Sequence, residues 1–425
     1  MSITPSTVDD PAEVIPEQPK RGSLATTFSA MRYRDFRLVW IGAFISTTGT
    51  WMQTVAQSWL VFSMTQSAFL LGLDAFLGTL PIILFSLFGG VAADRFDRRK
   101  MLMTSQILQM TFAFVLAALI VTGKVQVWHI FILSFLTGTA QSIGGPAYQA
   151  LLPVLVKREH IPNAIAMNSL QFNLARVIGP VLAGLALVSY GAAVCFVLNG
   201  LSFVAVIVTL LMVHGSMVPR NQGVRESFLK DLRAGFAFME KNRTLIHLSV
   251  IGFASTFFGI PIVTMLPVVA RDVFHLGAQG YSWILTASGA GSVCGALIVA
   301  ASGHINRKGK LALWFQLAFA AFLLIFAFSQ QLWLSMLMVF CAGACLLGVV
   351  TMISSLVQLA TSEEMRGRVV SIFMLAFRGG MPLGNLTAGY MAEVFSVRLA
   401  LSINALALGA VALMFLIPRT KVKEL

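Results

Sequence analysis

Three charged side chains lie inside long apolar stretches of this sequence, where a charge is expensive to keep. Asp74 lies toward one end of its stretch, whereas Arg176 and Arg378 lie 12 residues into theirs, or about 18 Å along a helix at 1.5 Å per residue. Ionisable residues in such segments pair with one another, move protons or bind charged ligands. We therefore expect Asp74 and Arg378 to act in proton coupling, and Arg176 and Arg378 to contact a substrate.

Polar side chains recur at helical spacing in the same stretches. Spacings of three and four residues place such a set on one helical face, and hydrocarbon forces that face toward protein or water. The sets predict a substrate cavity with a positive bias, although hydrogen bonding between helices explains any single member equally well. They are Ser46, Thr50, Gln53 and Gln57; Ser169, Asn173 and Arg176; Ser371, Arg378 and Asn385; and Gln141 with Tyr148.

The remaining reactive residue types form no enzyme-like constellation. The sequence has no Walker loop, and its six histidines are scattered near the ends of apolar segments. Its four cysteines lie inside apolar segments, without metal-ligand spacing or a nearby pair of histidines. We therefore expect no catalysis, no metal and no cofactor.

Composition indicates a polytopic, all-α membrane protein. Of the 425 residues, 57% are hydrophobic and only 11% are charged, against about 25% charged in ordinary soluble domains. A hydrocarbon core about 30 Å thick needs roughly 20 apolar residues for each crossing helix. Twelve stretches are predicted to cross: 38–62, 68–92, 101–122, 129–153, 164–188, 190–213, 244–269, 280–302, 310–329, 332–357, 366–392 and 397–417.

The placement of Lys and Arg predicts the orientation in the membrane. With the N-terminus inside, 25 of the 30 lie on the inner side, 3 on the outer side and 2 within helices. Because positive charge accumulates in cytoplasmic loops, both termini are expected in the cytoplasm. The net charge of +13 then belongs to membrane-surface loops, so we expect no nucleic-acid partner.

The longest polar and basic stretch divides the helices into two sets of six. Pro180 follows Arg176 by four residues in the fifth helix, and Pro382 follows Arg378 by four in the eleventh. A correspondence six helices apart indicates an internal repeat. The predicted organisation is a disordered cytoplasmic tail over 1–30, a six-helix bundle over 31–213, a cytoplasmic linker over 214–243 and a second six-helix bundle over 244–425.

A charged loop between the second and third helices carries the clearest motif. Residues 89–100 read GGVAADRFDRRK, which resembles the signature loop of the major facilitator superfamily, with Asp97 where the family usually has glycine. The resemblance implies a gating role for the residues that match the motif. These are Gly90, Asp94, Arg95 and Arg98.

In the family fold the second and eleventh helices are neighbours. The resemblance therefore implies that Asp94 latches the inner side shut against the N-terminus of the eleventh helix, where the macrodipole favours an acid. Thr361 to Glu364 form a capping-box pattern at that N-terminus. The alternative is a loop that only sets topology. The same neighbour relation implies an ion pair between Asp74 and Arg378, released by protonation, with a static brace between the two helices as the alternative.

Gly179 and Pro180 stand in a second motif, in the fifth helix. It is similar to the G-x-x-x-G-P-x-x-G-G pattern that the superfamily associates with exporters, with alanine at two of its places. The resemblance implies a gating role for both residues, and close packing of small residues is the alternative. Glu393, at the end of the eleventh helix, is expected to be a solvated cap.

The resemblance covers residues 31 to 418. Around GTWMQTVAQSWLVFSMTQS the chain looks like the subgroup of enterobactin-type siderophore exporters, secretion transporters and macrolide-efflux transporters. This implies two six-helix bundles that export an amphipathic small molecule from a bacterial cytoplasm by proton antiport. The expected partners are the substrate, protons and the bilayer, with the protein a monomer in the inner membrane. An importer or lipid translocator on the same fold, and a non-transporting receptor, are the alternatives.

Overall fold

The computed structural model describes residues 28–213, 228–301, 307–417 and 422, and every regular element in them is helical. The helices break at residues that favour turns. Gly191 has a φ of 82°, a left-handed conformation that glycine adopts without strain. Ser396 is an N-cap whose Oγ accepts a 3.2 Å hydrogen bond from the backbone N–H of Leu399. Both of these very short turns lie where the sequence predicts them.

The α-helices in chain order are α2 (Arg34–Thr65), α3 (Ala68–Arg95), α4 (Arg98–Val121), α5 (Val127–Leu151), α6 (Ile161–Tyr190), α7 (Ala192–Met212), α8 (Phe228–Lys241), α9 (Arg243–Ala254), α10 (Pro261–Val268), α11 (Ala278–Ala301), α12 (Lys308–Phe328), α13 (Leu332–Leu359), α14 (Glu363–Val394) and α15 (Val397–Leu416). Short 3-10 turns lie at η1 (Ser29–Arg32), η2 (Leu152–Leu155) and η3 (Arg158–His160), and π-helical turns at η4 (Ser255–Gly259) and η5 (Val269–Val273).

Ten helical segments of the described chain are long and apolar enough to cross a membrane. They include ten of the twelve expected stretches, and the two others fall in α2 and α5. These helices have 32 and 25 residues, which is ample length at 1.5 Å per residue. They also carry polar side chains such as Gln53, Gln57 and Gln141, which lower their hydropathy. The protein is a multi-pass membrane protein, and the full count of twelve spans stays a prediction.

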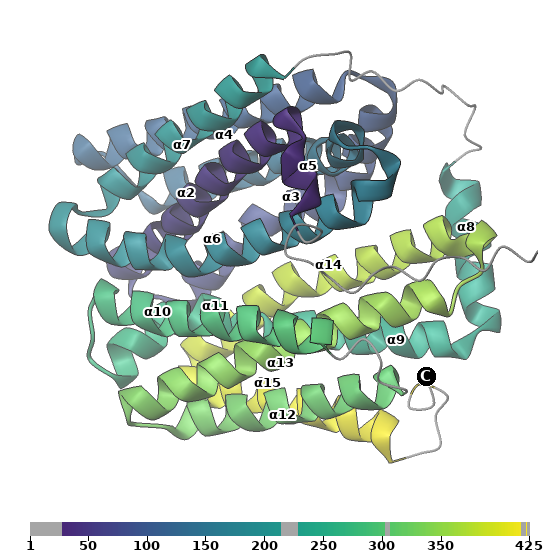
Figure 1. The fold of residues 1–425 in the computed structure, drawn as a ribbon. Coiled ribbons are helices and arrows are strands. Elements are labelled where there is room, and N and C mark those ends of the chain that lie inside the picture. The colour runs from purple at the N-terminus through teal and green to yellow at the C-terminus, as the bar shows by residue number, and fades with distance from the viewer. Residues whose placement is uncertain (1–27, 214–227, 302–306, 418–421, 423–425) are drawn as a thin grey trace, which may run out of the picture.

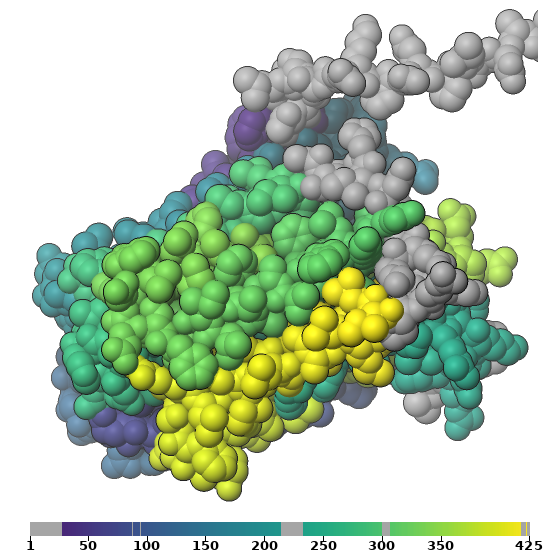
Figure 2. All heavy atoms as spheres, turned by 90° about the horizontal axis from the view of Figure 1, so that it is seen from below, coloured from purple at the N-terminus to yellow at the C-terminus, as the bar shows by residue number. Residues whose placement is uncertain are grey.

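Helices α2 to α7 form one half and α9 to α15 the other, visible in Figure 1 as two stacked groups. In the first half α2 packs on α6 and α7, and α4 packs on α5 and α7. In the second, α12 packs on α13 and α15, and these helices cover the face seen in Figure 2. The halves meet along two helix pairs, α3 with α14 and α6 with α11. Helices α3 and α14 correspond to the second and eleventh expected stretches, so these two helices are neighbours, as expected.

The two ends of the bundle differ in how the halves pack. We call the end with the turns at 66–67, 191 and 395–396 the short-loop end, and the opposite end, where α7 finishes and α9 begins, the linker end. At the short-loop end one continuous buried cluster takes side chains from both halves, including Phe196 and Tyr281. At the linker end each half has a separate cluster, around Phe36 in the first and Phe373 in the second. The halves are thus joined at the short-loop end and apart at the linker end.

The seventh expected helix, 244–269, differs from its prediction. The helical segment runs from Arg243 to Val273 and contains the two π-helical turns η4 and η5. At η4 the backbone of α14 comes very close, because a Cβ on Gly380 would lie 2.9 Å from the backbone nitrogen of Phe257. Such π-helical turns are local interruptions of an α-helix and are common at functional sites. Hydropathy detects the span but carries no signal for them.

Candidate functional site

Asp74 is the centre of a buried polar cluster built by three helices of the first half. It lies on α3 and is 6% exposed. Its Oδ2 accepts a 2.8 Å hydrogen bond from Gln57 Nε2 on α2, and its Oδ1 accepts a 2.5 Å bond from Ser134 Oγ on α5. Gln57 Nε2 also donates to Ser134 Oγ at 2.8 Å. The carboxyl group is therefore held by neutral donors only.

The expected ion pair between Asp74 and Arg378 is not formed in this structure. Arg34 pairs with Asp35 and Glu159 with His160, whereas no ion pair of Asp74 or Arg378 occurs among the described residues. Although α3 and α14 are neighbours, Asp74 lies among helices of its own half, whereas Arg378 is exposed on α14. The helix adjacency was right, and the side-chain pairing inferred from it was wrong for this conformation.

One face of α14 shows where the two halves part. Residues at spacings of three and four share a helical face. Toward the short-loop end this face lies against α3, where a Cβ on Gly72 would come within 3.1 Å of Gly389 Cα. Toward the linker end the same face is exposed. Its exposed members are Ser371, Leu375 and Arg378, and its buried members are Pro382, Asn385 and Gly389.

Asn385 therefore belongs to the closed end and not to an open cavity. It is 3% exposed, and its Oδ1 accepts a 2.9 Å hydrogen bond from Thr264 Oγ1 on α10. Its place on the predicted polar stripe was correct. Its expected role as a cavity residue does not fit this conformation, because the stripe passes from solvent into the contact between the halves.

Arg176 lies near the middle of α6, where the two halves meet. A Cβ on Gly289 of α11 would lie 2.7 Å from the carbonyl oxygen of Arg176. The guanidinium carbon lies 5.6 Å from the centre of the Trp51 ring, within cation–π range. Its Nε is buried and has no hydrogen-bond partner in the described part of the chain. Trp51 escaped the sequence analysis because it stands beside the polar stripe of α2 and not in it.

The other expected cavity residues have mixed surroundings. Gln53 Oε1 accepts a 2.6 Å hydrogen bond from Asn199 Nδ2 on α7, so here the alternative of bonding between helices holds. Asn173 Nδ2 donates to the carbonyl oxygen of Ser169 within its own helix, at 2.8 Å. Gln141 is exposed, and no hydrogen bond of its side chain occurs among the described residues. Of this set, Gln141 alone is left with a free side-chain amide.

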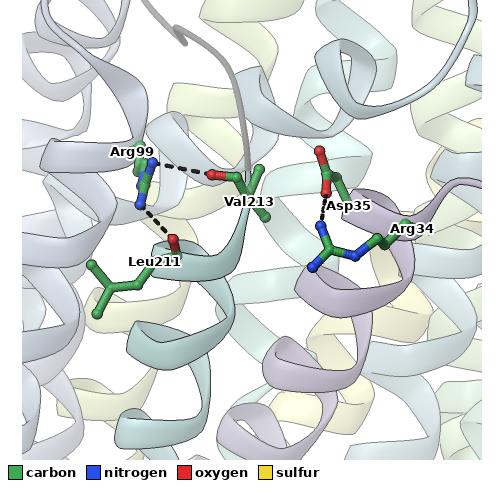
Figure 3. A network of polar contacts seen from close by, with 5 residues as sticks. All are labelled: Arg34, Asp35, Arg99, Leu211 and Val213. Atoms are coloured by element: carbon green, nitrogen blue, oxygen red, sulfur yellow. Dashed lines mark hydrogen bonds and ion pairs between the residues drawn. The ribbon is translucent and has the colours of Figure 1, made fainter.

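Most of the predicted charged loop at 89–100 is helical in the structure, because α3 extends to Arg95 and α4 begins at Arg98. Asp97 is the N-cap of α4, and its Oδ1 accepts hydrogen bonds from the backbone N–H groups of Arg99 and Lys100 at 2.9 and 3.3 Å. This explains an acid at the place where the superfamily usually has glycine, since Asp is a favoured N-cap. Arg99 donates to the carbonyl oxygens of Leu211 at 3.0 Å and Val213 at 3.2 Å, at the end of α7 (Figure 3). A cation suits that end of a helix.

The expected gating residues of this loop have separate surroundings. Arg98 donates to the carbonyl oxygens of Ala93 and Ala150 at 3.3 and 3.1 Å, and so ties the ends of α3 and α5 together. Arg95 is exposed, and a side chain on Gly90 would meet nothing within 4 Å. The side chain of Asp94 lies outside what the structure describes. Its latch therefore stays a prediction.

The predicted capping box at the start of α14 is absent. The N-cap is Ser362, and its side chain accepts no capping hydrogen bond. Thr361 Oγ1 instead donates to the carbonyl oxygen of Val357, at 2.6 Å in the preceding helix. The pattern misled because Thr361 still belongs to the turn that ends α13.

Gly179 and Pro180 are both buried in α6. A Cβ on Gly179 would lie 2.9 Å from the carbonyl oxygen of Thr48 and would collide with the Cβ of Trp51. The missing side chain therefore lets α6 lie directly on α2, within the first half. Small-residue packing accounts for Gly179 in this conformation, and a gating role for the motif stays a prediction.

A membrane bundle of two helical halves, joined at one end and apart at the other, with a buried acid among its helices, has the architecture of secondary transporters. The chain belongs to the transmembrane secretion effector family of the major facilitator superfamily, whose family model matches residues 25–425. The sequence resemblance is thereby confirmed.

Similar proteins of known name are exporters and other transporters. The chain is 24% identical to the staphyloferrin A transporter of Staphylococcus aureus, over 90% of this chain and 95% of that one. It is 25% identical to the multidrug efflux pump Tap of Mycolicibacterium fortuitum, over 91% and 97%. It is 29% identical to the enterobactin exporter EntS of Shigella boydii, over 79% of each chain.

Solved transporter structures share the fold. The nucleoside transporter NupG superposes with a TM-score of 0.70 at 15% identity, covering 90% of this chain and 98% of that one. A bacterial homologue of the human lysosomal transporter Spinster, inward-facing and occupied, gives a TM-score of 0.70 at 13% identity, covering 92% and 96%. At these identities the likeness concerns the fold alone.

Proposed function

We propose that this protein exports an amphipathic, anionic small molecule from a bacterial cytoplasm by proton antiport. The observation that carries the proposal is the Asp74 cluster. A buried acid with no cationic partner in its cluster can change its protonation state without breaking an ion pair. The enterobactin exporter and the multidrug efflux pump among the similar proteins support the direction of transport.

The cluster suits both protonation states of Asp74. As a carboxylate, Asp74 accepts from Gln57 Nε2 and Ser134 Oγ. When it is protonated, its O–H needs an acceptor, and a serine hydroxyl can both donate and accept. Rotation of the Ser134 hydroxyl then satisfies the neutral acid without moving a helix. Because an unpartnered buried polar group costs about 1 to 3 kcal/mol, this tolerance makes proton binding and release both feasible.

The substrate is proposed to bind between the halves. Arg176 from the first half and Arg378 from the second supply two cations, and Trp51 supplies an aromatic face next to Arg176. The buried Nε of Arg176 has no partner in the described chain, so a bound anion that accepts from it would satisfy it. The flat ring of Trp51 suits an amphipathic ligand with a planar group.

Orientation follows from the charge placement. With Lys and Arg concentrated at the linker end, that end is proposed to face the cytoplasm of a bacterial inner membrane. The conformation described here, apart at the linker end, is then inward-facing. One charge moved across 100 mV supplies about 2.3 kcal/mol, enough for a roughly 50-fold gradient. Protons entering from the short-loop side would drive substrate outward.

An efflux assay tests the proposal. Siderophores, macrolides, dyes and lysolipids are loaded into an efflux-deficient host, and their loss is followed with and without a protonophore. We expect protonophore-sensitive efflux of one class, reduced at least tenfold by Asp74→Asn. Asp272→Asn serves as the control, because Asp272 is an exposed acid near the short-loop end. Efflux that survives the protonophore contradicts antiport, and net accumulation of a compound establishes import instead.

A further inference from the structure

Glu393 makes a hydrogen-bonded contact between the two halves at the short-loop end. It is the penultimate residue of α14. Its Oε2 accepts hydrogen bonds from the backbone N–H groups of Ala68 at 2.7 Å and Phe69 at 3.3 Å. These are the first two residues of α3, in the other half. Glu393 is exposed and acts as a helix cap, in line with the sequence-based expectation, but the helix that it caps belongs to the opposite half.

The carboxylate completes the N-terminal cap of α3. The first N–H groups of a helix have no partner within it. Within α3, Ser67 Oγ accepts from the N–H of Leu70 at 3.1 Å, which leaves the N–H groups of Ala68 and Phe69 to Glu393. A negative charge at a helix N-terminus is also favoured by the macrodipole. Glu393 is thus bound by charge-assisted hydrogen bonds, which are stronger than neutral ones.

The surrounding contacts place Glu393 at the edge of a tight seam between α3 and α14. A Cβ on Gly389 would lie 2.8 Å from the carbonyl oxygen of Ala68 and 3.1 Å from Gly72 Cα. The rings of Phe69 and Tyr390 meet edge to face, with centroids 6.3 Å apart. Backbone contact, ring contact and carboxylate cap all join the same two helices. This seam must open whenever the halves separate at the short-loop end.

We infer that Glu393 is a gating residue that holds the short-loop end closed, an inference that rests on the alternating access of the proposed function. The two hydrogen bonds form only while the N-terminus of α3 and the C-terminus of α14 are in contact. When the end opens, these hydrogen bonds are replaced by hydrogen bonds to water. The contact therefore stabilises the closed state by the difference in free energy between the two kinds of hydrogen bond. The strength of this cap then sets how often the transporter opens toward the short-loop side.

The position of Glu393 has a counterpart at the other end of the same helix pair. Helix α3 runs from the short-loop end to the linker end and α14 runs back. Asp94 is the penultimate residue of α3, as Glu393 is of α14. Asp94 therefore lies at the end of the bundle where α14 begins, and Glu393 lies at the end where α3 begins. The latch expected of Asp94 at the linker end and the contact of Glu393 would then engage alternately.

The charged neighbours of Glu393 offer a matched control. Asp272 and Arg398 line the same pocket of about 380 Å³. Neither forms an ion pair with Glu393 within the described residues. Asp272 is exposed, and removing it deletes an equal charge from the same pocket without touching the cap of α3.

Distance measurements on the full-length protein in lipid nanodiscs test the inference. The four native cysteines are replaced by alanine, and spin labels are placed at Lys124→Cys and Gln330→Cys, exposed turn residues of the two halves at the short-loop end. Electron paramagnetic resonance then gives the fraction of molecules open at that end. We expect Glu393→Ala to raise the ratio of open to closed molecules about tenfold.

Two further variants sharpen the test. Glu393→Gln keeps an acceptor oxygen but loses the charge, so its ratio should lie between those of wild type and Glu393→Ala; it also stands in if the alanine variant fails to fold. Asp272→Ala should match wild type. The inference is overturned if both Glu393 variants match wild type, if no variant populates an open state, or if Asp272→Ala opens the end equally. No substrate or proton gradient is needed, so a failed efflux assay and a failed latch are separate results.

Discussion

Gln57 Nε2 lies 2.8 Å from Asp74 Oδ2, so that an amide on α2 and a buried acid on α3 share a part-buried hydrogen bond. Gln57 was expected to line a substrate cavity, yet its nitrogen is turned to Asp74 and to Ser134. The residue is therefore better placed to support proton transfer than to touch substrate. Substitution of Gln57 therefore distinguishes a role in proton transfer from a role in substrate binding.

Replacing Gln57 by leucine should slow proton-coupled efflux about tenfold. The change leaves the ionised form of Asp74 with Ser134 as its one donor in the cluster, and a lost donor to a buried charge costs about 1 to 3 kcal/mol. Release of the proton then becomes the difficult step. The measurement is the initial rate of protonophore-sensitive efflux in proteoliposomes.

Gln279→Leu, at the start of α11 and outside the predicted substrate cavity, is the control for this change. It removes the same amide group from an exposed position without a side-chain hydrogen bond in the described chain. If the two leucine variants transport at equal rates, Gln57 has no part in coupling.

Gly179→Ala should destabilise the first half. Its new Cβ would be forced against Trp51 and would lie 2.9 Å from the carbonyl oxygen of Thr48, and overpacking of this kind costs about 1 to 3 kcal/mol. The thermal unfolding midpoint in detergent should fall. Gly145→Ala in α5 meets nothing within 4 Å, and alanine is the better helix former by about 1 kcal/mol. A midpoint that falls equally in both variants contradicts the packing explanation.

Asp97→Ala should lower stability by about 1 kcal/mol, because it removes the side-chain cap of α4. Asp97→Gly, which restores the usual family residue, should cost only a few tenths of a kcal/mol, since glycine is itself tolerated as an N-cap. Thermal unfolding of the two variants checks the order. A glycine variant less stable than the alanine variant would show that the carboxylate acts through something other than the cap.

Arg176→Lys should weaken substrate binding about 2- to 30-fold while the maximal rate changes little. Lysine keeps the charge but lacks the flat guanidinium that lies over Trp51, and cation–π contacts are worth about 0.5 to 2 kcal/mol. Trp51→Leu should shift KM in the same direction. The measurement is the concentration dependence of efflux.

Arg271→Lys is the matched control for Arg176. Arg271 makes a similar contact, 5.5 Å above the ring of Phe62, near the short-loop end and away from the proposed substrate site. Equal changes in KM at both arginines would mean that Arg176 acts on conformation and not on substrate.

Much of the fold could be predicted because its signals are local. Membrane helices are recognised as long apolar runs in the sequence. The break at Gly191 follows from the backbone freedom of glycine, and the break at Ser396 follows from N-capping. The candidate residues Asp74, Arg176 and Arg378 were found because charge in an apolar run is rare. The one sequence signal for Trp51 is its spacing of three residues from Thr48, which places both residues on the face of α2 that packs against Gly179 of α6.

The sequence by itself determined the class of the protein, the helices and the residues worth testing, because hydropathy and helical periodicity are properties of neighbouring residues. Tertiary structure decided the partners. Asp74 is hydrogen-bonded to Gln57 and Ser134 instead of paired with Arg378. Asn385 accepts a hydrogen bond from Thr264. Glu393 caps a helix that begins 325 residues away in the chain. The physical reason is that a hydrogen bond needs its two groups within about 3 Å. Which distant groups meet that condition depends on how the two halves lie in a given conformation.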